Sequence, residues 1–118
     1  MYPNTNRLPR NEFHHVFDTS TRLHSYDMTI IAARNAVETN RFGIIVGKTV
    51  HKHAVIRNRI KRLIRSSLSS LLPRLSPNND IVFLVRKNMS EKKQTDVTRL
   101  IEQDLSKLHI LSHEITHS

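Results

Sequence analysis

The sequence predicts one small α+β domain, a mixed β-sheet with helices packed on it, in the order α-β-β-α-β-α. Residues 54–72 and 90–111 repeat apolar side chains at the spacing of an amphipathic helix. Residues 42–48 and 80–86 are short, nearly continuous apolar runs, which is typical of buried strands. A length of 118 residues suits a single domain with a modest core.

The N-terminal third is expected to contain a tail, a helix and a strand. Residues 1–9 carry two prolines and are expected to form a flexible tail, so the domain itself covers 10–111. The polar stretch 19–25 is expected to be a loop, and 26–33 the first strand. Residues 10–18 are expected to form a short helix, because apolar side chains recur at i, i+3 and i+4: Phe13, Val16 and Phe17.

The remaining elements follow from similar signals. The second strand, 42–48, contains the only two glycines of the chain. The long helix 54–72 is stopped by the proline that follows it. The third strand, 80–86, is almost entirely apolar and is therefore expected to lie in the centre of the sheet. After the last helix, 90–111, residues 112–118 are expected to form a flexible tail.

Composition narrows the functional classes. The chain has no cysteine, which excludes disulfides and thiolate metal sites and suits a reducing compartment. Its longest apolar run, Ile81 to Val85, is far too short to span a membrane. No apolar signal-peptide stretch opens the sequence. We therefore expect a cytoplasmic protein without membrane association. The net charge of +9 favours nucleic acid as the partner over an anionic membrane surface.

The positive charge is concentrated in one segment. Residues 39–79 contain nine of the 19 Lys and Arg residues and no Asp or Glu. The ten basic residues elsewhere balance the ten acidic ones. A balanced protein with one positive segment indicates a polyanion held at a defined place.

The expected helix 54–72 divides this segment into two faces at 3.6 residues per turn. One face is apolar and is expected to dock on the sheet: Ile56, Ile60, Leu63, Ile64 and Leu71. The opposite face carries five cations around one amide: Arg57, Asn58, Arg59, Lys61, Arg62 and Arg65.

An ordinary solvated face is the simplest alternative for these cations. Such faces usually mix signs, whereas Arg57, Lys61 and Arg65 are like charges at i, i+4, which destabilise a helix by a few tenths of a kcal/mol per pair. This repulsion predicts an anionic partner. RNA is favoured over DNA, because the basic face spans over two turns and guanidinium groups bridge closely spaced phosphates.

The run Arg57-Asn58-Arg59-Ile60-Lys61-Arg62-Leu63-Ile64-Arg65 resembles the Arg-Asn-Arg helix of the protein subunit of bacterial ribonuclease P. Three further stretches are similar to that family: residues 41–46, the aromatic-bearing 11–17, and 80–87. The resemblance covers about residues 8–110. It implies a fold shared with a ribosomal protein domain, in which the crossover through the basic helix is left-handed.

The resemblance also implies a function. The subunit joins a large catalytic RNA, and the complex removes the 5′ leader from precursor tRNA. The RNA binds Mg²⁺ and performs the hydrolysis, so this chain is expected to have no catalytic residues and no metal site. Outside the ribonucleoprotein it is expected to be a monomer.

Two sets of site residues follow from the resemblance. The catalytic RNA is expected to contact Arg57, Asn58, Arg59, Lys61, Arg62 and Arg65. The leader is expected to bind between the first helix and the sheet, at Phe13, Phe17, Tyr26, Lys48, Lys52 and Phe83. By spacing alone, Phe13 and Phe17 fit a core pair better than a binding platform. The family often has a second lysine where this chain has Thr49, and Lys52 is expected to replace its charge.

Other interpretations of the sequence remain open at this point. A ribosomal or other structural-RNA protein shares the charge pattern, and a stand-alone nuclease would need clustered acids, whereas Asp18 and Asp27 are isolated. Residues 113–117 match the H-E-x-x-H zinc pattern but lie at the chain end, so we interpret them as a polar tail. His51 and His53 are interpreted as polar surface rather than metal ligands.

Overall fold

A four-stranded sheet forms the middle layer of the computed structural model, which describes residues 2–18 and 21–111. Its strands are β1 (Thr21–His24), β2 (Met28–Arg34), β3 (Arg41–Ile45) and β4 (Asn79–Val85). Three α-helices accompany it: α1 (Phe13–Asp18), α2 (Ala54–Leu71) and α3 (Gln94–Lys107). Short 3₁₀ turns lie at Asn4–Asn6 (η1), Arg10–Glu12 (η2) and Leu72–Arg74 (η3).

The strands lie in the order β1-β2-β4-β3. β4 pairs with β2 in antiparallel fashion and with β3 in parallel, which makes the sheet mixed. The apolar strand β4 therefore lies in the interior of the sheet, as its composition indicates.

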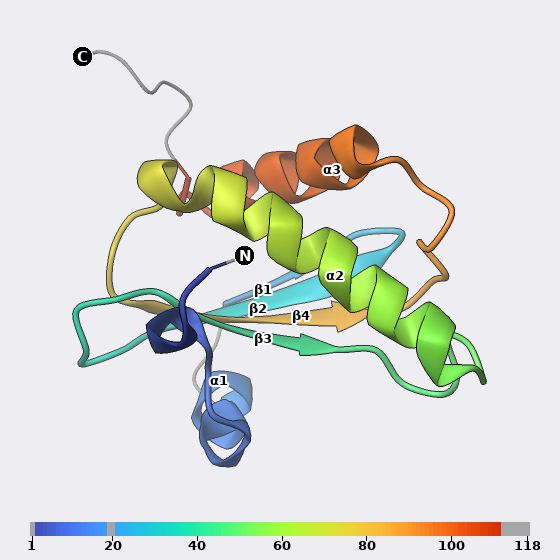
Figure 1. The fold of residues 1–118 in the computed structure, drawn as a ribbon. Helices are drawn as coiled ribbons and strands as arrows, with labels where there is room; N and C mark the ends of the chain where they lie inside the picture. Colours follow the sequence, from blue (N-terminus) through green and yellow to red (C-terminus); the bar gives the residue numbers. More distant parts are fainter. Residues whose placement is uncertain (1, 19–20, 112–118) are drawn as a thin grey trace.

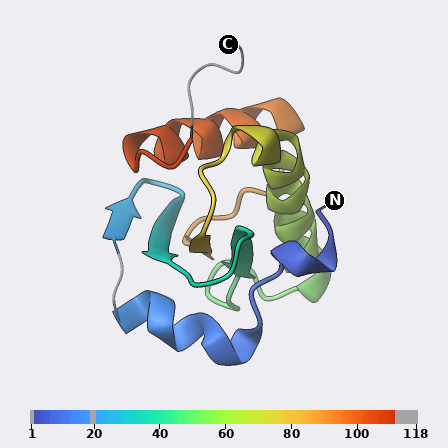
Figure 2. The ribbon, with the colours of Figure 1, turned by 90° about the vertical axis from the view of Figure 1, so that its left-hand side faces the viewer.

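The helices cover both faces of the sheet (Figures 1 and 2). α2 and α3 lie side by side on one face, and α1 crosses the other. Because side chains alternate along a strand, each face has its own core. Phe42, Ile81 and Phe83 pack with the two long helices, whereas Ile31 and Val82 pack under α1.

The connection from β3 through α2 to β4 is a left-handed crossover. Of the four strands, β3 lies nearest to the viewer in Figure 1, with α2 above the sheet, and Figure 2 agrees from the side. The chain runs along β3, returns above the sheet through α2, and enters β4 behind β3. Seen as in Figure 1, the chain turns counterclockwise while it moves away from the viewer, from β3 to β4. Such a crossover is left-handed and breaks the usual right-handed rule. The resemblance implied this crossover.

The expected order α-β-β-α-β-α lacks one strand that the structure contains. Residues 19–25 were expected to be a loop, but β1 pairs with β2 over Thr21–His24. Three of its four residues are exposed, so no apolar alternation marks it as a strand. Backbone pairing at the edge of the sheet forms it instead, because β2 offers unpaired donors and acceptors.

The prediction of a flexible tail over residues 1–9 is wrong for the described residues 2–9. Leu8 is buried, and its amide donates to the carbonyl of Phe42 at 2.9 Å. The ring of Tyr2 lies 5.1 Å from that of Phe42. These apolar and backbone contacts, with a bond from the Asn6 side-chain amide to the carbonyl of Asn40 at 2.7 Å, hold this segment beside β3. The expected tail 112–118 lies outside the described residues.

α3 is shorter than the expected helix 90–111. It ends in a Schellman motif: His109 has φ 61°, its amide donates to Ser106, and that of Ile110 donates to Leu105. Ile110 and Leu105 are both buried, so an apolar contact accompanies the turn. At the other end, Met89 is fully buried in an irregular segment that precedes the helix.

Candidate nucleic-acid interface

The apolar face of α2 docks on the sheet as predicted. Its buried side chains include Ile60, Ile64, Leu68 and Leu71. On the other side, Asn58, Arg59 and Arg62 are exposed, and Arg57, Lys61 and Arg65 are half-buried. Within the described residues, no carboxylate forms an ion pair with any α2 cation. The structure thus leaves the six predicted residues on the sides of α2 that face away from the apolar core, and no carboxylate among the described residues pairs with the cations.

Arg57 differs from the others because its guanidinium turns back along the chain. Its Nη1 donates to the carbonyls of His51 and Lys52, at 2.9 and 3.0 Å. No side chain caps the start of α2 at His53, so these bonds stabilise the link before the helix. The acceptors are neutral carbonyls, and the charge of Arg57 therefore remains uncompensated.

The N-terminal segment adds cations that the sequence interpretation missed. Arg7 and Arg10 line a pocket of about 340 Å³ with Lys61 and Arg65. Burial lowers the pKa of Lys61, and the charges of Arg65, Arg10, Arg57 and Arg7 lower it further. No acid lines this pocket among the described residues. The only sequence signal for this arrangement was an apolar residue, Leu8, between Arg7 and Arg10.

A second groove extends the basic surface from α2 to the start of α3. Its volume is about 330 Å³, and Arg59, Arg62 and Gln94 lie along it. The side-chain amide of Gln94 donates to the carbonyl of Leu63 and to the hydroxyl of Ser67, both at 2.8 Å. These bonds hold the two helices together along the groove.

On the opposite face of the sheet, α1 presents Phe13 and Phe17. Both are half-buried and pack against the cluster around Val16 and Val82. The guanidinium of Arg22 lies 5.9 Å from the centre of the Phe17 ring. Each ring is therefore packed in part on the core and accessible in part at the surface.

The prediction that Phe83 lines the leader cleft is wrong. Its side chain is fully buried among residues that pack with α2 and α3. Because side chains alternate along β4, the next residue, Leu84, turns toward the α1 face with Val82. Leu84 is half-buried and lies opposite Ile45 in the register. A uniformly apolar strand carries no sequence signal for which residue faces which side.

The other predicted leader residues lie away from α1. Tyr26 is 78% exposed in the turn before β2, with Lys87 Nζ 5.2 Å from its ring centre. Lys48 and Lys52 are exposed in the link after β3. Strands β3 and β4 both end toward this side, whereas α1 is anchored near the start of β4. At about 3.3 Å per residue, the sheet face from Asp80 to the end of β4 is on the order of 17 Å long.

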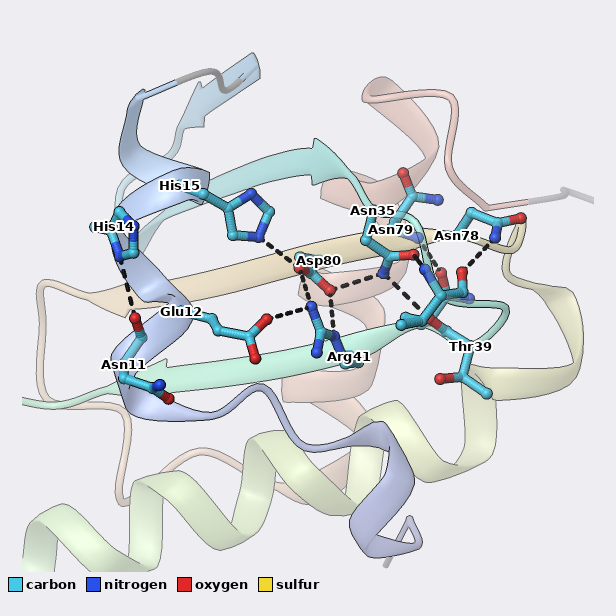
Figure 3. A network of polar contacts seen from close by, with 12 residues as sticks. Asn11, Glu12, His14, His15, Asn35, Thr39, Arg41, Asn78, Asn79 and Asp80 are labelled. Atoms are coloured by element: carbon cyan, nitrogen blue, oxygen red, sulfur yellow. Dashed lines mark hydrogen bonds and ion pairs between the residues drawn. The ribbon is translucent and has the colours of Figure 1, made fainter.

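A polar network fastens α1 to the sheet (Figure 3). The Asp80 side chain is fully buried. Arg41 donates to both of its carboxylate oxygens at 2.8 Å, and Asn35 donates at 2.7 Å. His15 Nε2 lies 2.6 Å from Oδ2. Burial alone would raise the pKa of Asp80, but the bonds from Arg41, Asn35 and His15 hold that pKa below its usual value. Arg41 also reaches Glu12, at 2.9 Å.

Other candidate sites find no support among the described residues. Within 2–18 and 21–111, no group of three or more His, Cys, Asp or Glu side chains is placed to hold a metal ion. The rings of His51 and His53 lie 5.2 Å apart. The H-E-x-x-H run at 113–117 lies outside the described residues. No helix in the described part of the chain has the length and hydrophobicity that a membrane crossing requires.

Comparisons with known proteins point to one family. A family model described as Ribonuclease P matches residues 2–109. The Ribonuclease P protein component of Microcystis aeruginosa is 33% identical over 114 residues, which cover 92% of this chain and 95% of that protein. The corresponding component of Nostoc punctiforme is 36% identical over 113 residues, with 77% and 81% covered.

Solved structures agree on the fold. The RNase P protein of Staphylococcus aureus superposes with a TM-score of 0.80 at 20% identity, over 91% of this chain and 98% of that one. The RNase P protein of Thermotoga maritima gives a TM-score of 0.69 at 25% identity, over 86% and 93%.

Proposed function

This chain belongs to the ribonuclease P protein family, and from that premise we propose that it binds the catalytic RNA through α2 and the precursor-tRNA leader through the α1 face of its sheet. It is the protein subunit of ribonuclease P, the endoribonuclease that matures tRNA 5′ ends. The geometry of the chain's own side chains supports the proposal of these two binding surfaces.

The observation that carries the catalytic-RNA assignment is the uncompensated charge of α2. Arg59 and Arg62 are exposed. Burial is the largest cause of the lowered pKa of Lys61, and the cations that surround it lower that pKa further. Phosphates of a folded RNA supply the missing negative charge. The pocket shared with Arg7 and Arg10 belongs to the same surface, because it places four cations at one opening.

The leader assignment rests on the α1 face of the sheet. An unpaired strand is held by aromatic stacking and a cationic wall, with little reading of sequence. Phe17 with Arg22 supplies such a pair near α1, and Tyr26 with Lys87 supplies another beyond the end of β4. Half-buried Ile45 and Leu84 lie on the sheet face between them. Lys48 and Lys52 add positive charge where β3 leads into α2.

Chemistry is assigned to the RNA partner. In this proposal Mg²⁺ is bound by the catalytic RNA, and the protein contributes binding and orientation only. The lack of a three-residue metal cluster within 2–18 and 21–111 is compatible with that division. The cytoplasmic location and the monomeric state outside the complex, both expected from the sequence, belong to the same proposal.

Reconstitution tests the function directly. The chain is added to a bacterial ribonuclease P RNA at low Mg²⁺, where we expect it to raise the cleavage rate of precursor tRNA. The Arg59→Ala/Arg62→Ala variant should require a higher protein concentration for the same rate. Arg99→Ala, an exposed cation on α3, is the matched control. No stimulation by the folded wild-type protein would contradict the proposal.

A further inference from the structure

The helix that carries Phe13 and Phe17 is tied to the sheet at two polar points. Glu12 ends η2 and His15 lies in α1, three residues later and therefore on the same side of the helical run. Glu12 contacts Arg41, and His15 contacts Asp80. Arg41 and Asp80 are themselves direct neighbours in the β3–β4 register. Both polar contacts thus end on one cross-strand pair (Figure 3).

These contacts set where α1 lies over the sheet. The Phe13 ring lies against Gly43, two residues beyond Arg41 and on the same face of β3. Val16, on the next turn of α1, is fully buried. The polar contacts near the strand starts and the apolar contacts beside them leave α1 little freedom to slide or tilt.

Stability alone is a weak explanation for this network. The Arg41–Asp80 pair is largely buried, and such a pair adds little net stability relative to apolar residues of the same volume, because desolvation of the charges offsets their attraction. The side chains of Glu12 and His15 are 42% and 34% exposed, and ion pairs at such exposure also contribute little to stability. α1 has six residues, too few to hold a helix without tertiary contacts. Its position is therefore decided by what it touches, and charged contacts with fixed directions specify a position more narrowly than apolar ones.

We propose that Glu12 and His15 are positioning residues for leader binding. They hold α1 at a fixed height above β3 and β4. At that height Phe13 and Phe17 form one wall of a groove, and the sheet face forms its floor. This inference rests on the proposed function. Neither side chain needs to touch the leader. Loss of the two contacts lets α1 move outward, so the aromatic side chains no longer meet an unpaired strand at stacking distance.

The test compares two substrates with reconstituted holoenzyme. One is a precursor tRNA with a single-stranded 5′ leader, and the other is the same tRNA without the leader. The ratio of their affinities isolates the contribution of the leader. For Glu12→Ala/His15→Ala we expect this ratio to fall about tenfold, since displacements near 1 Å have effects of that order or larger. Affinity for the catalytic RNA should stay unchanged.

Two further variants separate positioning from general damage. His15→Gln should keep most of the ratio, because its amide nitrogen donates from about the place of His15 Nε2. His14→Ala is the matched control: His14 is exposed, and its Nδ1 contacts the carbonyl of Asn11, not the sheet. In the double variant Asp80 keeps its bonds from Arg41 and Asn35, so the buried carboxylate remains paired.

The outcomes are distinct. An unchanged ratio in the double variant, with a clear leader preference in the wild type, would overturn this inference alone. A wild-type holoenzyme with no leader preference would overturn the leader assignment and this inference with it. If the double variant loses as much affinity for the catalytic RNA as for the leader, the network serves the whole fold. That result would also overturn the inference. If the double variant does not fold, Glu12→Ala and His15→Ala are tested separately, and each is expected to lower the affinity ratio about threefold.

Discussion

The Cζ end of the Phe13 ring lies against Gly43. A Cβ built on Gly43 would meet Cε1 and Cε2 of that ring at 2.9 Å, and Cζ closer still. Real Cβ atoms do not approach other carbons so closely. The absence of a side chain at this one position in β3 therefore permits the seating of α1 on the sheet.

Gly43→Ala should destabilise the protein by about 1–3 kcal/mol, because the added methyl group must push the Phe13 ring and α1 away from β3. Urea denaturation of the free protein measures the change. Gly47→Ala is the control, since a Cβ there would have Thr49 Oγ1 as its nearest neighbour at 3.7 Å, an ordinary contact. Equal losses in the two variants would show that the Phe13 contact is not the cause.

Arg59→Ala and Arg62→Ala should each weaken binding to the catalytic RNA and reduce its salt dependence. Each lost phosphate contact lowers the slope of log K against log salt by about one. Titration of the RNA at several salt concentrations gives the slope. Arg99→Ala should leave it unchanged. A slope that stays at the wild-type value in both α2 variants would place those side chains away from phosphates.

Lys61→Met should stabilise the free protein while it weakens RNA binding. The substitution keeps the apolar stem and removes two repulsive i, i+4 pairs, with Arg57 and Arg65, for a gain of about 0.5 kcal/mol at low salt. Burial and the neighbouring cations already lower the pKa of Lys61, so its charge is unfavourable in the free fold. A loss of both stability and RNA affinity would contradict this account.

Tyr26→Ala should reduce affinity for leader-containing tRNA with no effect on stability, because the side chain is 78% exposed. Stacking on one base contributes about 1–3 kcal/mol, and an exposed ring is expected at the lower end, near a fivefold loss. Tyr26→Phe, which keeps the ring, is the control. If alanine and phenylalanine behave alike, no base stacks on this residue.

The stability contributed by Asp80 should be present at neutral pH and disappear in acid. Its folded-state pKa is lowered from the ordinary 3.8, so the contribution is complete above about pH 5 and is lost as pH falls through the lower folded value. Asp80→Asn should therefore cost about 3–5 kcal/mol at pH 7 and progressively less below pH 4. Denaturation curves from pH 7 to pH 2.5 test this, and a constant difference would contradict it.

The helical elements could be predicted from sequence because their signals are local. In α2 the apolar residues Ile60 and Ile64 and the cations between them are neighbours on the chain, and helix geometry alone divides them into two faces. The basic surface therefore followed from spacing. The end of α3 could not be predicted from spacing. The residue with positive φ there is His109, not a glycine, and burial of Ile110 stabilises the turn.

The surface proposed to bind the leader depends on pairing between strands that are distant in the sequence. In β4 every residue from Ile81 to Val85 is apolar, so the sequence contains no alternation from which to decide that Phe83 faces the long helices and Leu84 faces α1. Pairing with β2 and β3 decides it. The edge strand β1 is likewise defined by a partner far along the chain rather than by its own residues.

By itself, the sequence determined the family, the amphipathic helix and the place of the positive charge, since each depends on residues a few positions apart. The tertiary structure alone decided that Arg7 and Arg10 join the cations of α2, and that Asp80 holds α1 through Arg41 and His15. These contacts join segments up to 65 residues apart in the chain. They form only when the sheet register and the left-handed crossover bring those segments together.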